Sequence, residues 1–313
     1  MTCKVLHLIT HLGVGGAQDN TLHTVGGLDR ARYEVHLGAG VGEDDWVGRA
    51  RALADRVYLI PPLIKPIAPW HDLAALRALV ALIRQERYAI VHTHSSKAGV
   101  LGRIAARLAG VPLVIHTVHG LPWSQHTPAP LRLVYQRIEA YLARHSQHLI
   151  TVAESNRQEL IACGVAGPAQ VTTIYSGIDC APPQPPLDRA ALCHTLGLDP
   201  HKPIVGSVAR LSPQKAPLDL LRAIKLVQAQ IPGAQCVLVG DGPLRQQVEA
   251  AARGMGRVLL LGSRDDVAAL LPLFDVFALA SHWEGLGRAV SEALLAGLPA
   301  AVTAVNGVPE LVA

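Results

Sequence analysis

The stretch Ser281-His-Trp-Glu-Gly-Leu-Gly-Arg-Ala-Val-Ser-Glu-Ala-Leu-Leu-Ala-Gly-Leu-Pro299 decides the fold. An apolar segment at 276–280 ends just before it and predicts a strand. Small and apolar residues then recur at helical spacing until a Gly-Leu-Pro sequence ends the helix. Glu284 and Glu292 therefore bracket a helix start at the carboxyl end of a strand.

The spacing of these glutamates predicts two separate contacts. Inside one helix they would lie about 12 Å apart along the axis and roughly 80° apart around it. They would therefore serve different parts of a long ligand. Between them, the amides of Gly285, Leu286 and Gly287 at a helix N-terminus favour negative charge. A ligand with hydroxyls at both ends and a diphosphate in the middle fits this arrangement.

The pattern Ser-x-x-Glu-Gly, followed after six residues by Glu-Ala-x-x-x-Gly-x-Pro, resembles the signature of the retaining GT-B glycosyltransferases of the group 1, or family-four, class. The resemblance extends over essentially the whole chain. It implies an α/β fold with two Rossmann-like, doubly wound domains facing a cleft. The family normally continues beyond the point that resembles Ala313, so we expect an incomplete second domain, reduced stability and little activity.

Alternating strand and helix patterns predict parallel sheets covered by helices. A proline-rich segment, 176–200, interrupts the alternation and predicts a linker. We expect an acceptor-side domain at 1–175 and a donor-binding domain for a nucleotide sugar at 201–313. The predicted strands are 4–9, 34–39, 56–60, 90–93, 113–117, 148–151, 171–174, 204–208, 236–239, 258–261, 276–280 and 300–303.

The composition of the 313-residue chain, half of it hydrophobic, is that of a globular protein with two domains. No apolar run is long enough for a transmembrane helix, and we expect a cytoplasmic protein. The five cysteines are scattered and contain no Cys-x-x-Cys pair, which predicts neither a disulfide framework nor a zinc site.

Basic charge is concentrated in the first half of the chain. Residues 1–175 contain 17 Lys and Arg against 12 Asp and Glu, whereas 176–313 contain 11 against 12. One interpretation of this uneven charge is an ordinary solvated surface. The other is a surface that attracts an anionic membrane face or a phosphate-bearing acceptor. Segment 130–145, with arginines among apolar residues, is the candidate for peripheral contact with the inner face of a membrane. Nothing predicts a nucleic-acid partner.

A glycine-rich turn, Gly13-Val-Gly15-Gly16-Ala-Gln18, follows the first predicted strand. It lacks the third glycine of a dinucleotide-binding fingerprint, and no acid follows the second strand, so we reject an NAD site. A tight turn is one interpretation. The other is close approach of the Gly15 and Gly16 backbone to a diphosphate, which the resemblance of this run to the family's loop favours.

Histidines cluster near two strand ends, in His92-Thr-His94 and His116-Thr-Val-His119. Histidines at strand ends are more often buried and hydrogen-bonded than metal-bound, so we predict no metal site. His119 resembles the family's histidine that contacts the donor sugar and its phosphate. Ser96 and Lys97 resemble residues on the acceptor side.

Two cations flank the turn Ala209-Arg-Leu-Ser-Pro-Gln-Lys215 after a predicted strand. Arg210 and Lys215 are either solvated surface charges or a clamp for a diphosphate. The turn resembles the family's arginine and lysine segment, which implies the second role. The family usually has glycine after this lysine, whereas Ala216 stands here, so the path of the turn is open.

The resemblance implies a retaining, metal-independent transferase without a cofactor. Glu292 would hold the nucleotide ribose, Glu284 the sugar hydroxyls, and Arg210 with Lys215 the leaving diphosphate. His119 would orient the donor sugar. A uridine donor and a lipid-linked or cell-surface polysaccharide acceptor are expected from the resemblance alone. A sugar-nucleotide epimerase or hydrolase of the same architecture, or a non-catalytic nucleotide-sugar binder, are the alternatives.

Overall fold

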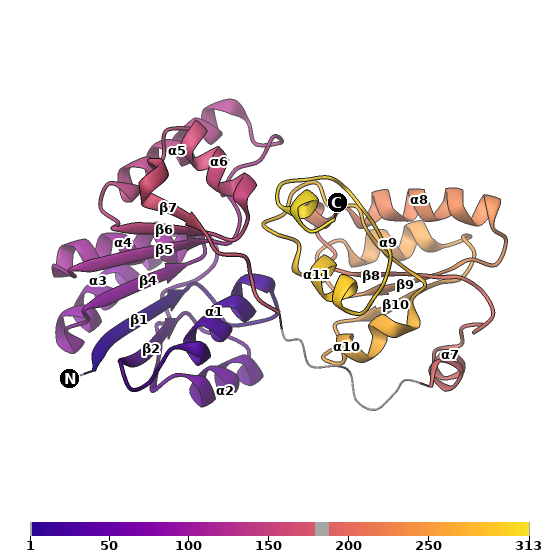
Figure 1. Ribbon diagram of the computed structural model, residues 1–313, viewed down its shortest axis with the longest axis horizontal. Helices are drawn as coiled ribbons and strands as arrows, with labels where there is room; N and C mark the ends of the chain where they lie inside the picture. The colour runs from indigo at the N-terminus through magenta and orange to yellow at the C-terminus, as the bar shows by residue number, and fades with distance from the viewer. Residues whose placement is uncertain (1, 179–187, 313) are drawn as a thin grey trace. The chain divides into compact units, whose positions relative to one another are not determined.

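The computed structural model describes residues 2–178 and 188–312 in two compact units, unit 1 within Met1–Gly177 and unit 2 within Ile178–Ala313 (Figure 1). The predicted linker lies partly outside the described residues. Its described end carries α7 (Arg189–Leu196), whose Cys193 side chain is buried in the core of unit 2. No helix in the described ranges is long and apolar enough to cross a membrane.

Unit 1 contains a seven-stranded parallel sheet in the order β3-β2-β1-β4-β5-β6-β7. The strands are β1 (Cys3–Ile9), β2 (Tyr33–Ala39), β3 (Arg56–Leu59), β4 (Ile90–His94), β5 (Leu113–Val118), β6 (His148–Thr151) and β7 (Val171–Thr173). The helices are α1 (Gly16–Gly27), α2 (Asp44–Leu53), α3 (Pro69–Glu86), α4 (Ser96–Ala109), α5 (Ala129–Ala143) and α6 (Glu154–Ala162).

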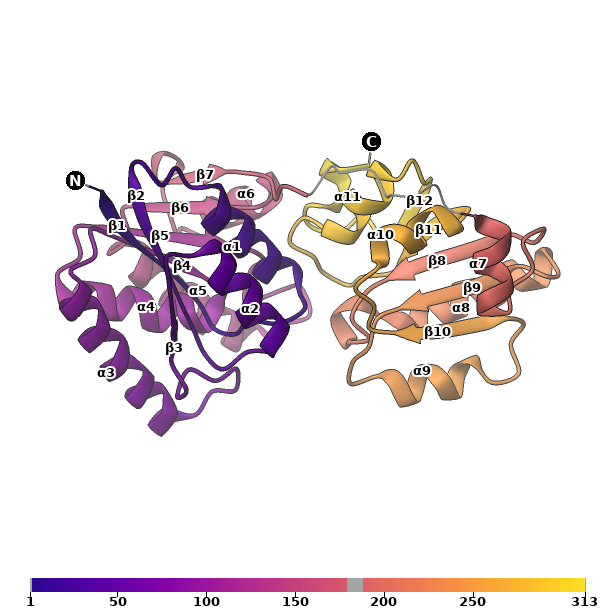
Figure 2. The same ribbon diagram turned by 90° about the horizontal axis from the view of Figure 1, so that it is seen from below.

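Successive side chains of a strand point to opposite faces, so each face of the unit 1 sheet has its own core. Leu6 and Leu8 of β1 pack with α3 and α4. Ile9 of β1 and Leu37 of β2 pack with α1 and α2 on the other face, and Figure 2 shows these two helix pairs on either side of the sheet.

Unit 2 contains a five-stranded parallel sheet in the order β10-β9-β8-β11-β12. Helices α8 and α9 cover one face, and α7, α10 and α11 contribute to the core on the other. The strands are β8 (Ile204–Val208), β9 (Gln235–Val239), β10 (Val258–Gly262), β11 (Val276–Leu279) and β12 (Ala300–Val302). The helices besides α7 are α8 (Pro217–Gln230), α9 (Arg245–Ala252), α10 (Val267–Leu270) and α11 (Arg288–Leu295).

The prediction of two parallel α/β sheets is confirmed. Each of the twelve predicted strands is present, and no strand end differs from its prediction by more than one residue. Four cysteines in the described ranges form no disulfide, and Cys180 lies outside those ranges.

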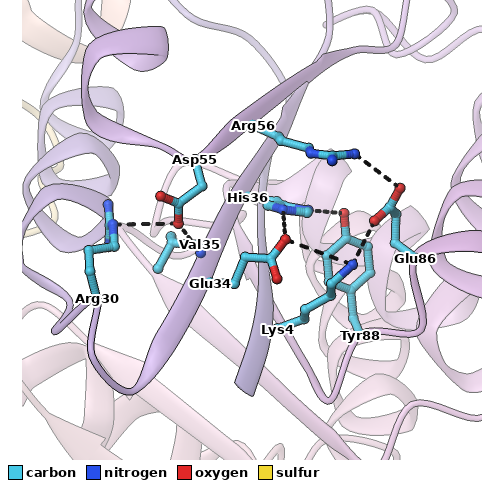
Figure 3. A network of polar contacts seen from close by, with 9 residues as sticks. All are labelled: Lys4, Arg30, Glu34, Val35, His36, Asp55, Arg56, Glu86 and Tyr88. Atoms are coloured by element: carbon cyan, nitrogen blue, oxygen red, sulfur yellow. Dashed lines mark hydrogen bonds and ion pairs between the residues drawn. The ribbon is translucent and has the colours of Figure 1, made fainter. Parts of the chain in front are cut away.

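A polar network ties together the amino ends of β1, β2 and β3 (Figure 3). Lys4 donates to Glu86 at 3.0 Å, and the buried His36 ring contacts Glu34 at 2.9 Å and the Tyr88 hydroxyl at 2.8 Å. The hydrogen bond from Lys4 holds the pKa of Glu86 below its usual range, and burial raises the pKa of Tyr88. Because this network lies at the amino ends of the strands, its role is structural.

Histidines occupy the middle of the unit 1 sheet. His7 pairs with His92 across β1 and β4, and His94 follows two residues later, so all three lie on the face of α1 and α2. His116 of β5 lies on the opposite face. Burial lowers the pKa of His7 to about 3 and those of His92, His94 and His116 well below 6.5.

These histidines predict that unit 1 loses stability in acid. The unfolded chain binds protons below pH 6.5 that the folded unit excludes, so this stability is present above pH 6.5 and falls by roughly 1.4 kcal/mol per pH unit for each histidine. The urea midpoint should therefore drop between pH 7.5 and 5.5 in a variant whose sole tryptophan is Trp123. A variant that retains only Trp283 reports on unit 2, whose described histidines are exposed. Its urea midpoint should fall less over the same pH range. Equal shifts would contradict the prediction.

A buried ion pair fastens α5 to α4 in unit 1. The Arg103 side chain is fully buried, and its guanidinium donates to Glu139 at 2.7 Å and to the Gly99 carbonyl at 2.8 Å. Removing one member of such a pair leaves an uncompensated buried charge, which costs about 3–5 kcal/mol.

We therefore expect Glu139→Ala to lower the free energy of unfolding of unit 1 by about 3 kcal/mol, measured by urea denaturation. The double variant Arg103→Met, Glu139→Leu fills a similar volume without charge and should recover most of that loss. A single variant as stable as the original chain would show that the pair contributes little.

Candidate functional site

Two loops of unit 2 meet because the strands before them are neighbours. β8 and β11 pair in parallel, so the loops that follow them begin at the same edge of the sheet, where such folds bind ligands. The His282 amide donates to the Gln214 carbonyl at 2.8 Å, and the Gln214 side chain donates to the Trp283 carbonyl at 2.9 Å. The loops are therefore joined by backbone as well as side-chain contacts.

An ion pair between Lys215 and Glu284 joins the same two loops. The Glu284 side chain is only 5% exposed, and its carboxylate also accepts from the Ser281 hydroxyl at 2.7 Å. The backbone amide of Glu284 donates to the Asn306 side chain at 3.0 Å. A buried carboxylate is thus fixed in place with its charge compensated, as a precise hydrogen-bond acceptor requires.

The turn after β8 reaches α8 through Ala216, at the position where the family usually has glycine. Ala216 adopts a left-handed conformation, with φ 44° and ψ 52°, and caps the N-terminus of α8. For an alanine this conformation costs roughly 1–2 kcal/mol. Arg210, two residues beyond β8, is exposed and makes no ion pair with the described part of the chain. Its guanidinium can therefore meet an anion without first breaking another pair.

The two glutamates of the first motif lie in different elements. Glu284 is in the loop, whereas Glu292 lies in α11 and accepts from Arg288 at 3.0 Å. Gly287, with φ 90°, caps the helix without a side-chain hydrogen bond, which leaves its first amides available to an anion. Leu286 is buried and anchors the loop.

In unit 1, Gly15 and Gly16 begin α1. Gly15 precedes the helix in an extended conformation, and Gly16 is its first residue. No side chain caps this helix start. Its first-turn amides are therefore open to an anion, and the contact of Gly15 and Gly16 with a diphosphate stays a prediction.

The predicted acceptor-side residues lie at the start of α4. Ser96 is exposed, whereas the Lys97 ammonium lies 2.5 Å from an oxygen of Asp72 and also donates to the Pro66 carbonyl. The charge of Lys97 is thus already balanced. The neighbouring Ser95, with φ 62°, contacts the Thr10 hydroxyl at 2.8 Å and so joins the loops after β1 and β4.

His119 directly follows β5 and is half-buried. Its Nε2 lies 3.1 Å from Nδ1 of His94, and burial lowers the pKa of His119 to about 4. His7, His92 and His94 each place one potential ligand nitrogen within 4.8 Å of the others. A metal ion there would have to displace the hydrogen bond between His7 and His94, which is 3.0 Å long.

Sequence reasoning gave no role to several residues that hold the site, although Ser281 stands in the quoted motif. Ser281 and Asn306 position Glu284, Asp72 neutralises Lys97, and His7 connects with the histidines near His119. Pairing β1 with β4 would have revealed His7, because both strands carry histidine at matched positions. No local signal marks Asp72.

Comparisons with known proteins cover both units. The family model described as Glycosyltransferase Family 4 matches residues 14–182, and the one described as Glycosyl transferases group 1 matches residues 202–313.

Two curated bacterial proteins are similar in sequence. The UDP-Gal:alpha-D-GlcNAc-diphosphoundecaprenol alpha-1,3-galactosyltransferase of Escherichia coli is 38% identical over 80% of this chain and 67% of its own length. The putative glycosyltransferase EpsD of Bacillus subtilis is 30% identical over 90% of this chain and 74% of its own length.

Solved structures share the architecture. HepE of Anabaena, in complex with UDP and glucose, matches 99% of this chain and 83% of its own with a TM-score of 0.83 and 25% identity. WaaG, described as a glycosyltransferase involved in lipopolysaccharide biosynthesis, matches 98% of this chain and 83% of its own with a TM-score of 0.76 and 16% identity, which shows the fold alone. With its two parallel-sheet units of the GT-B fold and family matches in both, the chain belongs to the group 1 glycosyltransferases.

Proposed function

We propose that this chain is a retaining, metal-independent transferase that moves a sugar from a uridine diphosphate donor to a hydroxyl of a lipid-linked or cell-surface glycan. The observation that carries the proposal is the Lys215–Glu284 pair, fixed between two loops at the carboxyl edge of the unit 2 sheet. The E. coli relative is named for a UDP-Gal donor, and HepE was solved in complex with UDP and glucose, which supports a uridine donor.

Each charged or polar part of the donor would contact a different residue. Glu292 would accept hydrogen bonds from the ribose hydroxyls and Glu284 from the sugar hydroxyls. The diphosphate would lie against the amides at the start of α11, close to residues 285–287. At the start of α1 in unit 1, Gly15 and Gly16 would allow the backbone to approach a diphosphate closely.

Arg210 and Lys215 would stabilise the leaving group. Negative charge grows on the departing diphosphate as the glycosidic bond breaks, and positive side chains already in place lower the energy of that transition state. Supplying this charge from the protein is the basis for proposing that no divalent cation is needed. Lys215 would hold both Glu284 and the diphosphate, and would thereby couple recognition of the sugar to its departure.

The acceptor hydroxyl would attack on the face from which the diphosphate leaves, because no side chain of the site is proposed as a nucleophile on the sugar. A phosphate oxygen of the donor would take the hydroxyl proton. His119, neutral at pH 7 because burial lowers its pKa to about 4, would orient the sugar by a hydrogen bond. Ser96 would face the acceptor, with Lys97 held beside it by Asp72.

A helix of unit 1 offers a surface for an anionic membrane. Apolar side chains of α5 spaced three or four residues apart are 40–50% exposed, namely Leu131, Val134, Ile138 and Tyr141. Exposed Arg137 and Arg144 flank this stripe. Because the E. coli relative is named for a diphosphoundecaprenol substrate, peripheral contact with the inner face of a membrane would bring the chain to such an acceptor.

Donor binding tests the assignment first. Calorimetric titration of UDP-galactose, UDP-glucose and UDP-N-acetylglucosamine in EDTA should show one tight ligand. Glu292→Ala should weaken its binding roughly 10- to 100-fold, because hydrogen bonds to a charged carboxylate are lost. Glu249→Ala, at an exposed glutamate of α9, is the matched control and should bind like the original chain. Equal binding by both variants would contradict the role of Glu292.

Product analysis separates the alternatives. A transferase releases UDP in proportion to glycosylated acceptor, whereas a hydrolase or epimerase converts the donor without acceptor. A binder shows affinity without turnover.

Vesicle binding tests the membrane surface. The chain should co-sediment with phosphatidylglycerol vesicles more than with phosphatidylcholine vesicles, and less as salt is raised, because its arginines meet anionic headgroups. Val134→Ser with Ile138→Ser should reduce sedimentation severalfold. Leu226→Ser, at a 69% exposed leucine of α8, is the matched control. Equal sedimentation of all variants would contradict the role of α5.

A further inference from the structure

Three histidines form a hydrogen-bonded chain from the interior of unit 1 to the end of β5. Nδ1 of His7 lies 3.0 Å from Nε2 of His94, and Nδ1 of His94 lies 3.1 Å from Nε2 of His119. His7 and His94 are 1% and 0% exposed, whereas His119 is half-buried. Pairing of β1 with β4 and of β4 with β5 holds the three rings in this order.

Each of these three histidine rings is neutral at pH 7 and carries one N–H proton. Burial lowers the pKa of His7 to about 3, that of His94 well below 6.5, and that of His119 to about 4. A neutral imidazole has one N–H donor, and its other nitrogen is an acceptor. Every nitrogen-to-nitrogen contact in the chain therefore needs a donor on one side and an acceptor on the other.

Only two proton arrangements satisfy both contacts. In the first, all three rings are protonated on Nε2, and His119 donates inward to His94. In the second, all three are protonated on Nδ1, so His7 donates to His94 and His94 donates to His119. In this second arrangement, Nδ1–H of His119 is left over as a donor. The tautomer of His119 is thus coupled to that of His7.

The ring nitrogen at the inner end of the histidine series, Nε2 of His7, decides between the two proton arrangements. Nε2 of His7 is buried and has no hydrogen-bond partner in the part of the chain that the structure describes. The first arrangement would bury an unpaired N–H there, whereas the second leaves only an unpaired acceptor. Unpaired buried N–H groups are the rarer of the two, at least for the backbone, where this has been surveyed. The second arrangement is therefore favoured.

We propose that His7 and His94 are positioning residues that hold His119 in its Nδ1–H tautomer, so that this nitrogen donates a hydrogen bond to an oxygen of the bound donor substrate. The ligand part of this inference rests on the proposed function. Nδ1 of His119 has no hydrogen-bond partner within the described residues, which leaves it available. A diphosphate or sugar oxygen is the acceptor that suits such a neutral donor.

The tautomer can be read directly from the ligand-free chain. Long-range ¹⁵N–¹H correlation spectra at pH 7.5 distinguish a protonated from an unprotonated ring nitrogen, and His119→Asn assigns the signals of His119. We expect a proton on Nδ1 and none on Nε2 of His119, unchanged between pH 6.5 and 8. A proton on Nε2 would overturn the proposal.

Variants test whether the inner histidines set this tautomer. His94→Leu removes the donor to His119, and His7→Leu removes the donor to His94, so either should give averaged signals from both tautomers of His119. His92→Leu is the matched control, because His92 is also buried but contacts the Thr117 hydroxyl at 2.7 Å and makes no hydrogen bond to the other histidines. An unaltered Nδ1–H signal of His119 in folded His94→Leu or His7→Leu would overturn the proposal that the inner histidines set its tautomer.

Donor titration separates this inference from the proposed function. With the donor identified by calorimetry, His94→Leu should bind it about tenfold more weakly, the loss expected for one hydrogen bond. If the original chain shows the Nδ1–H tautomer but His119→Asn binds the donor unchanged, the contact with the donor is overturned while the tautomer assignment stands.

Discussion

Parallel strands that end at one edge of a sheet bring their loops together, and this constraint governs both units. In unit 2 it places the loops after β8 and β11 side by side, so that Lys215 meets a buried Glu284. In unit 1 it joins the loops after β1 and β4 through Thr10 and Ser95. The polar network around Lys4 and His36 lies at the other edge of the unit 1 sheet, at the amino ends of the strands, and has a structural role.

The fold could be predicted almost completely from sequence because its strands are short apolar runs separated by longer segments that mix apolar and polar residues. Parallel strands buried on both faces produce such runs, and their ends fall where glycine, proline or charge begins. The helix after Glu284 was predicted from the helical spacing of its small and apolar residues and from the Gly-Leu-Pro sequence that ends it, and α11 lies there. Residues 179–187 of the predicted linker lie outside the described ranges.

The sequence allowed candidate site residues to be selected but not their contacts, because motifs identify residues and not their partners. The family resemblance selected Lys215 and Glu284 separately, 69 residues apart, and gave no sign that they pair. It also selected Lys97 without indicating that Asp72 already balances its charge. Contacts of this kind depend on which strands are neighbours, which the order of motifs along the chain does not reveal.

The two units prepare their functional groups by different physical means. Unit 2 keeps a charged carboxylate in a buried position by pairing it with a lysine, and a bound anion would compete for that lysine. Unit 1 keeps its histidines neutral by burial, and a neutral ring has no charge that must be compensated when the ligand is absent. His119 can therefore offer a directed hydrogen bond without attracting a counterion, whereas Lys215 requires Glu284 to hold its position. In the proposed function, charge stabilisation and orientation thus fall to different sets of residues, each held by its own sheet.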